Sequence, residues 1–494
     1  MRLRSCTVPL LLLFYFPLSF LTAQSLPLDA AFGTQGLATL DHGSDSPGRA
    51  TMAAIAADGK VLVGGYSFAG LSEPFCIARF LPNGTPDATF GTAGVAQHAR
   101  LEGAIKLQPL PDGKVLVLAE RGFRVDRLLA DGSYDPSFSI APVPGDEARR
   151  TYNSDLTVQP DGKILITAFN QDTPFDEYCV ARLLPDGQLD SGFGKNGRAF
   201  QPVYGAGTAS AVAIQSDGKI LVTGSGGNYK ISTARYTPAG RPDSTFGTNG
   251  LAIWGPVIGD YLSGREMSVQ PDGKIVVAAE VLDEPSRYAA LYRMNPDGSP
   301  DAGFGTAGMV SGIALTRVYG LRLQADGRIL IGGRHNDFAS LLRFQPNGLA
   351  DNAYAAKTTL GAWLADDDGD RVGFALQPDG KAVVAVPSVG FASVSQGFFA
   401  VRLNTSGSAD PSFSGDGRAF ADYSSGDDRI NDIALQPDGK IVVIGEAYSN
   451  YLDAEVLLAR YTVTGQLDAT FGSGGKKTFT LISGDNAYAY AVAV

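Results

Sequence analysis

The chain has 494 residues, of which 44% are hydrophobic and 61 are glycine, and its formal net charge at pH 7 is −11. This composition is typical of a turn-rich, all-β folded protein and excludes a largely disordered chain. The negative charge argues against nucleic acid or an anionic membrane surface as a partner, because both need a basic surface. We therefore expect a folded protein that binds no nucleic acid.

The N-terminal segment has the three-part layout of a secretory signal peptide. Two arginines precede an apolar run, Val8 to Leu21, and Ala23 or Ser25 offers a small residue for cleavage. The run is too short to span a bilayer comfortably, and no later segment is apolar enough to anchor the protein. We expect a signal peptide at residues 1–23 and a single domain at 24–494. The mature protein is expected to be monomeric, without a membrane span, and secreted to the extracellular space, the periplasm or the cell surface.

A turn of sequence Asp-Gly-Lys or Asp-Gly-Arg, called the DGK turn here, recurs at intervals of 49 to 59 residues. In its common form, Gln-Pro-Asp-Gly-Lys, proline presets φ, aspartate tolerates the next position and glycine accepts the left-handed conformation. This chemistry predicts a type I turn with a G1 bulge. The continuous apolar run after each turn predicts a strand covered on both faces. The turns begin at Asp58, Asp112, Asp161, Asp217, Asp272, Asp326, Asp379 and Asp438.

Each DGK turn is followed by a second hairpin, well shown by ARFLPNGTPDATFGTAG at residues 78–94. With a three-residue Pro-Asn-Gly loop, Arg79 faces Asp87 across the hairpin, and the same spacing recurs in every repeat. A catalytic pair is needed once rather than eight times, so we expect cross-strand ion pairs that contribute about 0.2–1 kcal/mol each. An aromatic residue three positions after each aspartate is expected to be a packing anchor. The pairs are Arg79/Asp87, Arg127/Asp135, Arg182/Asp190, Arg235/Asp243, Arg293/Asp301, Arg343/Asp351, Arg402/Asp410 and Arg460/Asp468.

Two hairpins in about 54 residues match one propeller blade, which is a four-stranded antiparallel sheet. The paired elements QPDGKIVV and ARLLPDGQLDSGFGKNG resemble the delta-60 repeat family of secreted bacterial proteins, across essentially the whole chain after the signal segment. That resemblance implies β-propeller units in exported or surface proteins, usually with no assigned activity. We predict an all-β fold: a β-propeller of four-stranded antiparallel blades that closes as a ring of eight. A truncated longer array is the alternative.

Three units depart from regular repetition. The second unit lacks the Phe-Gly-x-x-Gly tail after its second hairpin, and in the sixth and seventh units the last strand is expected to be less regular. Cys76 and Cys179 occupy equivalent points of non-neighbouring units, so they are expected to be free, buried thiols rather than a disulfide.

The turns of both hairpins fall on one face of such a ring, and they are uniform. The connections on the other face differ in length and composition, and variable loops on a rigid scaffold are where binding usually occurs. We therefore expect a ligand on this variable face or in the central channel. Aromatic residues beside carboxylates and amides suit a sugar or a peptide, although they also suit caps over the hydrophobic ends of the blades. The candidate ligand-binding residues are Tyr66, Phe75, Phe175, Tyr178, Trp254, Tyr261, Trp363, Tyr448 and Tyr451.

One acidic loop contains Asp366, Asp368 and Asp370 around a turn glycine. Clustered carboxylates of this kind can hold Ca²⁺, which takes six to eight oxygen ligands. The loop is not an EF-hand, because Gln377 stands where the bidentate glutamate would fall. A solvated acidic loop is the alternative that we favour, and we expect no cofactor elsewhere.

The search for catalytic motifs finds little. The chain has three histidines, none with the spacing of a zinc site, and no Gly-x-Ser-x-Gly motif. We therefore expect a non-catalytic binding scaffold with a protein or carbohydrate ligand. The alternative is a secreted hydrolase or lyase that acts on polysaccharide through carboxylates of the variable face.

Overall fold

The computed structural model describes 18 segments of the chain, and every regular element in them is a β-strand. The segments are residues 48–67, 75–82, 85–98, 104–119, 124–138, 155–170, 177–203, 208–226, 230–255, 261–283, 286–335, 338–354, 373–387, 398–421, 429–450, 453–472, 476–479 and 492–493. The proposed signal peptide lies outside them, so it remains a prediction.

Within the described segments the strands form eight sheets, and the first four follow one another along the chain. The first sheet contains β1 (Gly48–Ile55), β2 (Val61–Ser67), β3 (Phe75–Phe80), β4 (Val95–His98) and the distant β31 (Val492–Ala493). The second contains β5 (Ala104–Pro109), β6 (Val115–Ala119) and β7 (Val125–Leu128). The third contains β8 (Asp155–Val158), β9 (Ile164–Asn170), β10 (Glu177–Leu183) and β11 (Arg198–Pro202). The fourth contains β12 (Thr208–Ile214), β13 (Ile220–Gly226), β14 (Lys230–Tyr236) and β15 (Leu251–Trp254).

The other four sheets repeat the same order. The fifth contains β16 (Tyr261–Val269), β17 (Ile275–Asp283), β18 (Ser286–Met294) and β19 (Met309–Ile313). The sixth contains β20 (Arg317–Leu323), β21 (Ile329–His335) and β22 (Phe338–Phe344). The seventh contains β23 (Gly373–Leu376), β24 (Ala382–Pro387), β25 (Phe398–Leu403) and β26 (Arg418–Ala421). The eighth contains β27 (Arg429–Leu435), β28 (Ile441–Asn450), β29 (Asp453–Tyr461) and β30 (Lys476–Phe479).

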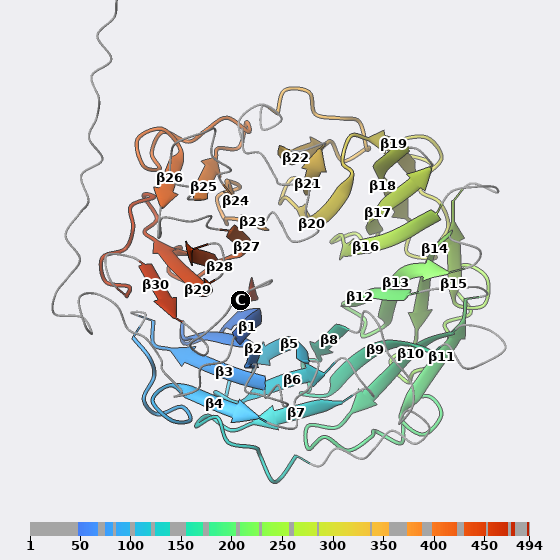
Figure 1. The fold of residues 1–494 in the computed structure, drawn as a ribbon. Helices are drawn as coiled ribbons and strands as arrows, with labels where there is room; N and C mark the ends of the chain where they lie inside the picture. Colours follow the sequence, from blue (N-terminus) through green and yellow to red (C-terminus); the bar gives the residue numbers. More distant parts are fainter. Residues whose placement is uncertain are drawn as a thin grey trace, which may run out of the picture.

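The sheets are arranged radially, with the first strand of each nearest the centre and the last at the periphery (Figure 1). All pairings are antiparallel except that of β31, which lies parallel to β1. Eight clusters of buried side chains each draw on two successive sheets, and one joins the last sheet to the first through Val442 and Leu458 against Val61 and Cys76. Neighbouring sheets therefore supply one another with a core.

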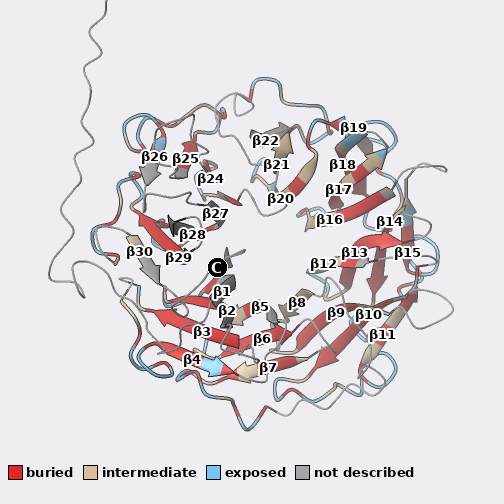
Figure 2. Ribbon diagram, viewed as in Figure 1, coloured by how far each residue is buried: buried red, intermediate tan, exposed pale blue. Residues whose placement is uncertain are grey.

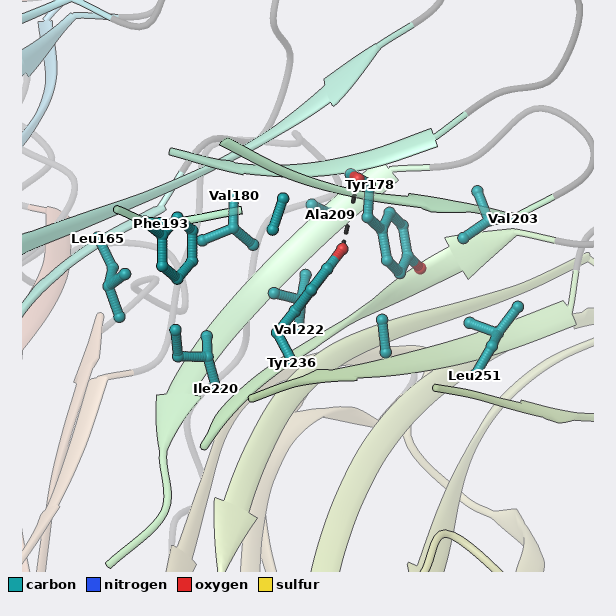
Figure 3. Packing of buried hydrophobic residues seen from close by; sticks show 12 residues of the cluster. Leu165, Tyr178, Val180, Phe193, Val203, Ala209, Ile220, Val222, Tyr236 and Leu251 are labelled. Carbon is teal, nitrogen blue, oxygen red and sulfur yellow. Dashed lines mark hydrogen bonds between the residues drawn. The ribbon is translucent and has the colours of Figure 1, made fainter. Parts of the chain in front are cut away.

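The strands after the DGK turns are buried along their whole length in the second and fourth sheets, as the continuous apolar runs predicted. Burial follows the middle strands of each sheet in Figure 2. Figure 3 shows the interface of the third and fourth sheets, where Phe193, Tyr178 and Tyr236 pack with aliphatic side chains. The hydroxyl of Tyr236 donates to the Tyr178 carbonyl over 3.4 Å. Neighbouring sheets thus cover the two faces of the sheets between them.

The DGK turns have the geometry that their residues predict. Gly439 has φ = 80°, and its N–H donates to the carbonyl of Gln436 over 2.8 Å. The Gln436 N–H in turn donates to the Lys440 carbonyl over 2.8 Å. The second hairpin also has the predicted register, since the Leu81 N–H donates to the Thr85 carbonyl over 2.8 Å.

The departures from regular repetition are only partly as expected. Among the described residues, the second and sixth sheets have three strands each. The seventh sheet does form its fourth strand, β26. Cys76 and Cys179 are buried and form no disulfide, as predicted, and burial raises the pKa of the Cys76 thiol to about 12.

In six of the eight units, the aromatic residue of the second hairpin packs against a glycine of the next sheet. A Cβ atom on Gly240 would lie 2.7 Å from the Phe193 ring, and one on Gly187 would lie 2.9 Å from the Phe138 ring. These glycines have φ of 76° and 88°. The aromatic is therefore a packing anchor, as predicted, but it anchors one sheet to the next.

We predict that Gly240→Ala destabilises the protein more than Gly218→Ala does. Both glycines have φ near 80°, so alanine costs about 1–2 kcal/mol at either position through backbone strain. At Gly218 the nearest atom to the new Cβ is 3.5 Å away, whereas at Gly240 the methyl overlaps Phe193 and adds about 1–3 kcal/mol of overpacking. Equal losses in urea-induced unfolding would contradict the contact between the sheets.

Candidate functional site

The repeated Arg/Asp pair forms an ion pair in all eight units, as the sequence predicted. In the seventh sheet, Arg402 Nε lies 2.7 Å from Asp410 Oδ2, and the guanidinium stacks on Phe413 at 4.7 Å from the ring centroid. Lys381 of the DGK turn lies 3.0 Å from the same carboxylate oxygen. The N···O distances of the eight pairs, from Arg79/Asp87 to Arg460/Asp468, run from 2.7 to 2.9 Å.

The arginine also reaches the next sheet, which the sequence did not predict. Arg402 Nη1 donates to the Val463 carbonyl in the second hairpin of the eighth sheet. Close by, the Ser414 N–H donates to the Thr464 carbonyl over 2.7 Å. We use the name clasp for the arginine–aspartate ion pair together with the stacked aromatic ring, the DGK-turn lysine and the hydrogen bonds to carbonyls of the next sheet. Equivalent arginine-to-carbonyl bonds run from Arg127 to Pro185, Arg182 to Pro238, Arg235 to Pro296, Arg293 to Pro346 and Arg343 to Thr405.

The contacts of the clasp lower the pKa of its aspartate. Burial, the largest single effect, raises the pKa of Asp410, but hydrogen bonds from Ser412 and Lys381 and the charge of Arg402 together lower it to about 2. Arg402 and Asp410 are both buried. Because the ionised pair is satisfied by several hydrogen bonds, it holds the hairpin and the neighbouring sheet together. The face that carries the DGK turns is therefore occupied by structural contacts in every unit.

The structure places the predicted ligand-binding aromatics in different surroundings. Phe75 is fully buried between the first and second sheets. Tyr178 is also fully buried, its hydroxyl donates to the Ser225 carbonyl over 3.0 Å, and burial raises its pKa. This burial is what the alternative interpretation, aromatic caps over the blade ends, expects for Phe75 and Tyr178.

The structure describes the backbone position of only some of the remaining candidate residues. Tyr66, Tyr261 and Tyr448 lie in β2, β16 and β28, near the strand ends at the variable face. Phe175, Trp363 and Tyr451 lie outside the described residues, and so do the proposed calcium ligands Asp366, Asp368 and Asp370. Their role as ligand-binding or metal-binding residues stays a prediction.

Trp254 lines a groove of about 400 Å³ between the outer strands of the fourth and fifth sheets. Its ring meets that of Tyr292 edge-on, with centroids 6.0 Å apart. The indole Nε1–H is buried and has no hydrogen-bond partner among the described residues. The groove is lined by Trp254, Gly255, Leu262, Val281, Tyr288, Tyr292, Thr306, Ala307, Met309 and Ser311.

The sequence did not single out Tyr288 and Tyr292, although a signal was present. They stand four positions apart in β18, so they share one face of the strand. That face packs toward the fourth sheet together with Trp254. The groove thus gathers three aromatic side chains from two neighbouring sheets.

A second groove, of about 300 Å³, lies between the first and second sheets at the DGK turns. Its lining includes Asp58, Lys60 and Arg79, and each of these is ion-paired within the chain: Lys60 with Asp58 at 2.9 Å, and Arg79 with Asp87 at 2.9 Å. The charged groups of this groove are therefore already engaged in ion pairs within the chain.

The described residues hold no group of three or more His, Cys, Asp or Glu side chains that could bind a metal ion. His98 is buried beside Tyr134, with ring centroids 4.7 Å apart, and burial lowers its pKa to about 4. Asp155, on the innermost strand of the third sheet, is paired with Lys106 at 2.6 Å. None of these groups has both the solvent exposure and the available proton-exchanging atom that a general acid or base needs.

Seven segments of the chain match the family described as "Domain of unknown function (DUF5122) beta-propeller": residues 56–90, 110–138, 159–193, 215–246, 270–304, 377–413 and 436–471. The fold and these matches define a β-propeller repeat protein. The chain belongs to this family, which is the delta-60 repeat type. The sixth unit is not matched, yet it contains the same clasp, with Arg343 2.8 Å from Asp351.

Solved structures with similar folds are distant. The polysaccharide lyase Uly1 is 9% identical, with 72% of this chain and 90% of that chain covered and a TM-score of 0.42. Virginiamycin B lyase from Staphylococcus aureus is 11% identical, with 68% and 92% covered and a TM-score of 0.39. A gluconolactonase from Xanthomonas campestris is 14% identical, with 59% and 85% covered and a TM-score of 0.31. At this level of similarity, nothing about activity carries over to this chain.

No curated protein matches the chain. In the part of the chain that the structure describes, no helix is long and apolar enough to cross a membrane.

We predict that Asp410 contributes stability that is lost in acid. Its pKa is about 2 in the folded protein and about 3.9 in an unfolded chain, so protonation favours unfolding. The contribution is fully present above pH about 4 and disappears as the pH falls toward about 2. The free-energy difference between wild type and Asp410→Asn, measured by urea unfolding, should therefore shrink over this window.

The matched control is Asp272→Asn, at an exposed DGK-turn aspartate. Its difference from wild type should be small throughout. A wild-type advantage over Asp410→Asn that is unchanged at pH 2 would contradict the clasp as the source of the low pKa.

Proposed function

We propose that this protein is a secreted, eight-bladed β-propeller that acts as a non-catalytic binding scaffold. The eight sheets among the described residues, the core cluster shared by the last and first sheets, and the pairing of β31 with β1 support a closed ring. The charged start, apolar run and small cleavage residue of the N-terminal segment support export.

The groove at Trp254 is the observation that carries the binding proposal. Its volume, about 400 Å³, is in the range of small-ligand sites, and its lining is mostly apolar and aromatic. The buried Nε1–H of Trp254 has no acceptor within the described segments of the chain, and a ligand oxygen can supply one. Flat rings with a fixed hydrogen-bond donor suit a carbohydrate chain, whose rings have apolar faces and hydroxyl edges.

The alternative is a hydrolase or lyase that acts on polysaccharide through carboxylates of the variable face. Both proposals involve a carbohydrate, so the experiment that distinguishes them measures whether the protein converts the carbohydrate into product. The protein should be incubated with a glycan panel while binding and the release of reducing ends or unsaturated products are measured. Binding without product supports the scaffold. Product formation that is abolished by changing one variable-face aspartate overturns it.

We predict that Trp254→Ala weakens glycan binding by about tenfold or more, which corresponds to roughly 1.4 kcal/mol for losing a central aromatic contact. The matched control is Ile253→Ala, because Ile253 is the preceding residue of β15 and is 46% exposed on its opposite face. Affinity for the bound glycan is measured by titration calorimetry. An unchanged affinity in Trp254→Ala would exclude the groove as the binding site.

A further inference from the structure

The second groove, between the first and second sheets, lies where two positions of the repeat carry small residues. The residue three positions before each DGK-turn glycine is glutamine in six of the eight units, but it is Ala56 in the first. The residue two positions before the loop glycine of each second hairpin is proline in five units, but it is Ala130 in the second. This is the one junction in the sequence at which both positions are alanine, and both alanines line the groove.

The larger residues cover the DGK-turn glycine where they are present. At the junction of the eighth and first sheets, a Cβ atom on Gly59 would lie 3.5 Å from Pro82 Cγ and 3.7 Å from Gln436 Nε2. At the junction of the first and second sheets, a Cβ atom on Gly113 would have one described atom beyond its chain neighbours within 4 Å, the Ala130 Cβ at 3.5 Å. The groove therefore occupies space that a proline ring and a glutamine amide fill elsewhere.

The change from glutamine to alanine also removes a hydrogen-bond donor. Gln436 Nε2 donates to the Gly59 carbonyl over 3.1 Å, and the glutamine of the sixth unit makes the equivalent bond to the seventh sheet over 3.3 Å. Ala56 has no side-chain donor for the corresponding carbonyl, that of Gly113. Within the described segments this carbonyl accepts no hydrogen bond, so it is an available acceptor in the lining of the groove.

Arg79 supplies a matching donor. Its Nε donates to Asp87 over 2.9 Å and its Nη2 to Thr89 over 3.2 Å, so the guanidinium is held in one position. Six arginines of the clasp also donate through Nη1 to a carbonyl of the next sheet, whereas Arg79 makes no such bond within the described segments. The same bond is missing at Arg460, but there the proline and the glutamine fill the junction.

The lining of the second groove favours a neutral ligand. Each cationic side chain in it already has an acidic partner: Arg79 has Asp87, Lys60 lies 2.9 Å from Asp58, and Lys114 lies 3.1 Å from Asp135. A ligand therefore has to offer one acceptor to the arginine and one donor to the backbone carbonyl. A carboxamide group carries both. The apolar lining comes from Ala56, Leu62, Pro109, Val115 and Ala130.

We propose that the second groove binds a polypeptide segment of a partner protein that presents a carboxamide side chain beside proline. The carboxamide oxygen accepts from Arg79 Nη1, and its N–H donates to the Gly113 carbonyl. A polypeptide is the source that the repeat indicates, because proline and glutamine of this chain fill the equivalent space at other junctions. The site lies at the DGK turns, apart from the Trp254 groove, so either proposal can fail without the other.

The test titrates three probes into the full-length protein by calorimetry: the capped peptide acetyl-Gln-Pro-Gln-Pro-amide, the same peptide with glutamate in place of both glutamines, and N,N′-diacetylchitobiose. The glutamine peptide should bind, and the glutamate peptide should bind about tenfold more weakly because an ionised carboxylate has no N–H donor. Absence of binding by the glutamine peptide, or equal binding of the two peptides, would overturn the proposal. Tighter binding of the disaccharide in this groove would identify an acetylated amino sugar as the ligand and overturn the assignment to polypeptide.

Filling the groove tests its location. The double variant Ala56→Gln, Ala130→Pro restores both residues of the repeat, so it should weaken binding of the glutamine peptide about tenfold or more. Ala57→Gln is the matched control, because Ala57 is exposed and adjacent but does not line the groove, and it should leave the affinity unchanged. Unchanged affinity in the double variant, or an equal loss in Ala57→Gln, would overturn the site.

Thermal unfolding of each variant verifies folding. If the double variant does not fold, Ala56→Gln alone decides the question, because it supplies the missing amide without altering the hairpin loop. Its affinity for the glutamine peptide should fall below that of Ala57→Gln, and equal affinities of these two variants would contradict the proposal.

Discussion

A buried arginine that contacts two sheets at once is the interaction on which the rest of this structure depends. In the seventh unit, Arg402 pairs with Asp410, stacks on Phe413 and donates to a carbonyl of the eighth sheet. A buried guanidinium without such partners would be strongly destabilising. Because each partner comes from a fixed position of the repeat, the arginine sets the register of its hairpin and the distance to the next sheet together.

This constraint explains why one face of the molecule is uniform. The clasp uses the loop carbonyl, the aspartate, the aromatic ring and the DGK-turn lysine, and a change in any one leaves a buried charge or a void. The connections on the other face contribute nothing to the clasp, so their sequences are free to vary. Ligand specificity is expected there and at the edges between sheets, where Trp254 lies.

The hairpins and the ion pairs could be predicted from the sequence because repetition shows which spacings matter. An arginine that stands eight residues before an aspartate in eight copies indicates a cross-strand ion pair that each repeat requires. The bond from Arg402 to the Val463 carbonyl could not be predicted. Every residue has a backbone carbonyl, so the residue type does not indicate which carbonyl accepts the bond. The groove at Tyr288 depends on how neighbouring sheets meet, which a single repeat does not encode. Phe75 and Tyr178 were among the candidate ligand-binding aromatics of the variable connections, but they lie in β3 and β10, and both side chains are buried.

The central claim is that the repeated aromatic and glycine form a contact between successive sheets. A double-mutant cycle on Phe413→Ala and Gly465→Ala tests it most directly, because a Cβ on Gly465 would lie 2.6 Å from the Phe413 ring across the interface. The free energies of unfolding should be non-additive: alanine at 465 should cost at least about 1 kcal/mol less once the ring is removed. Additivity within about 0.5 kcal/mol would show that the two residues do not touch, and would contradict the account.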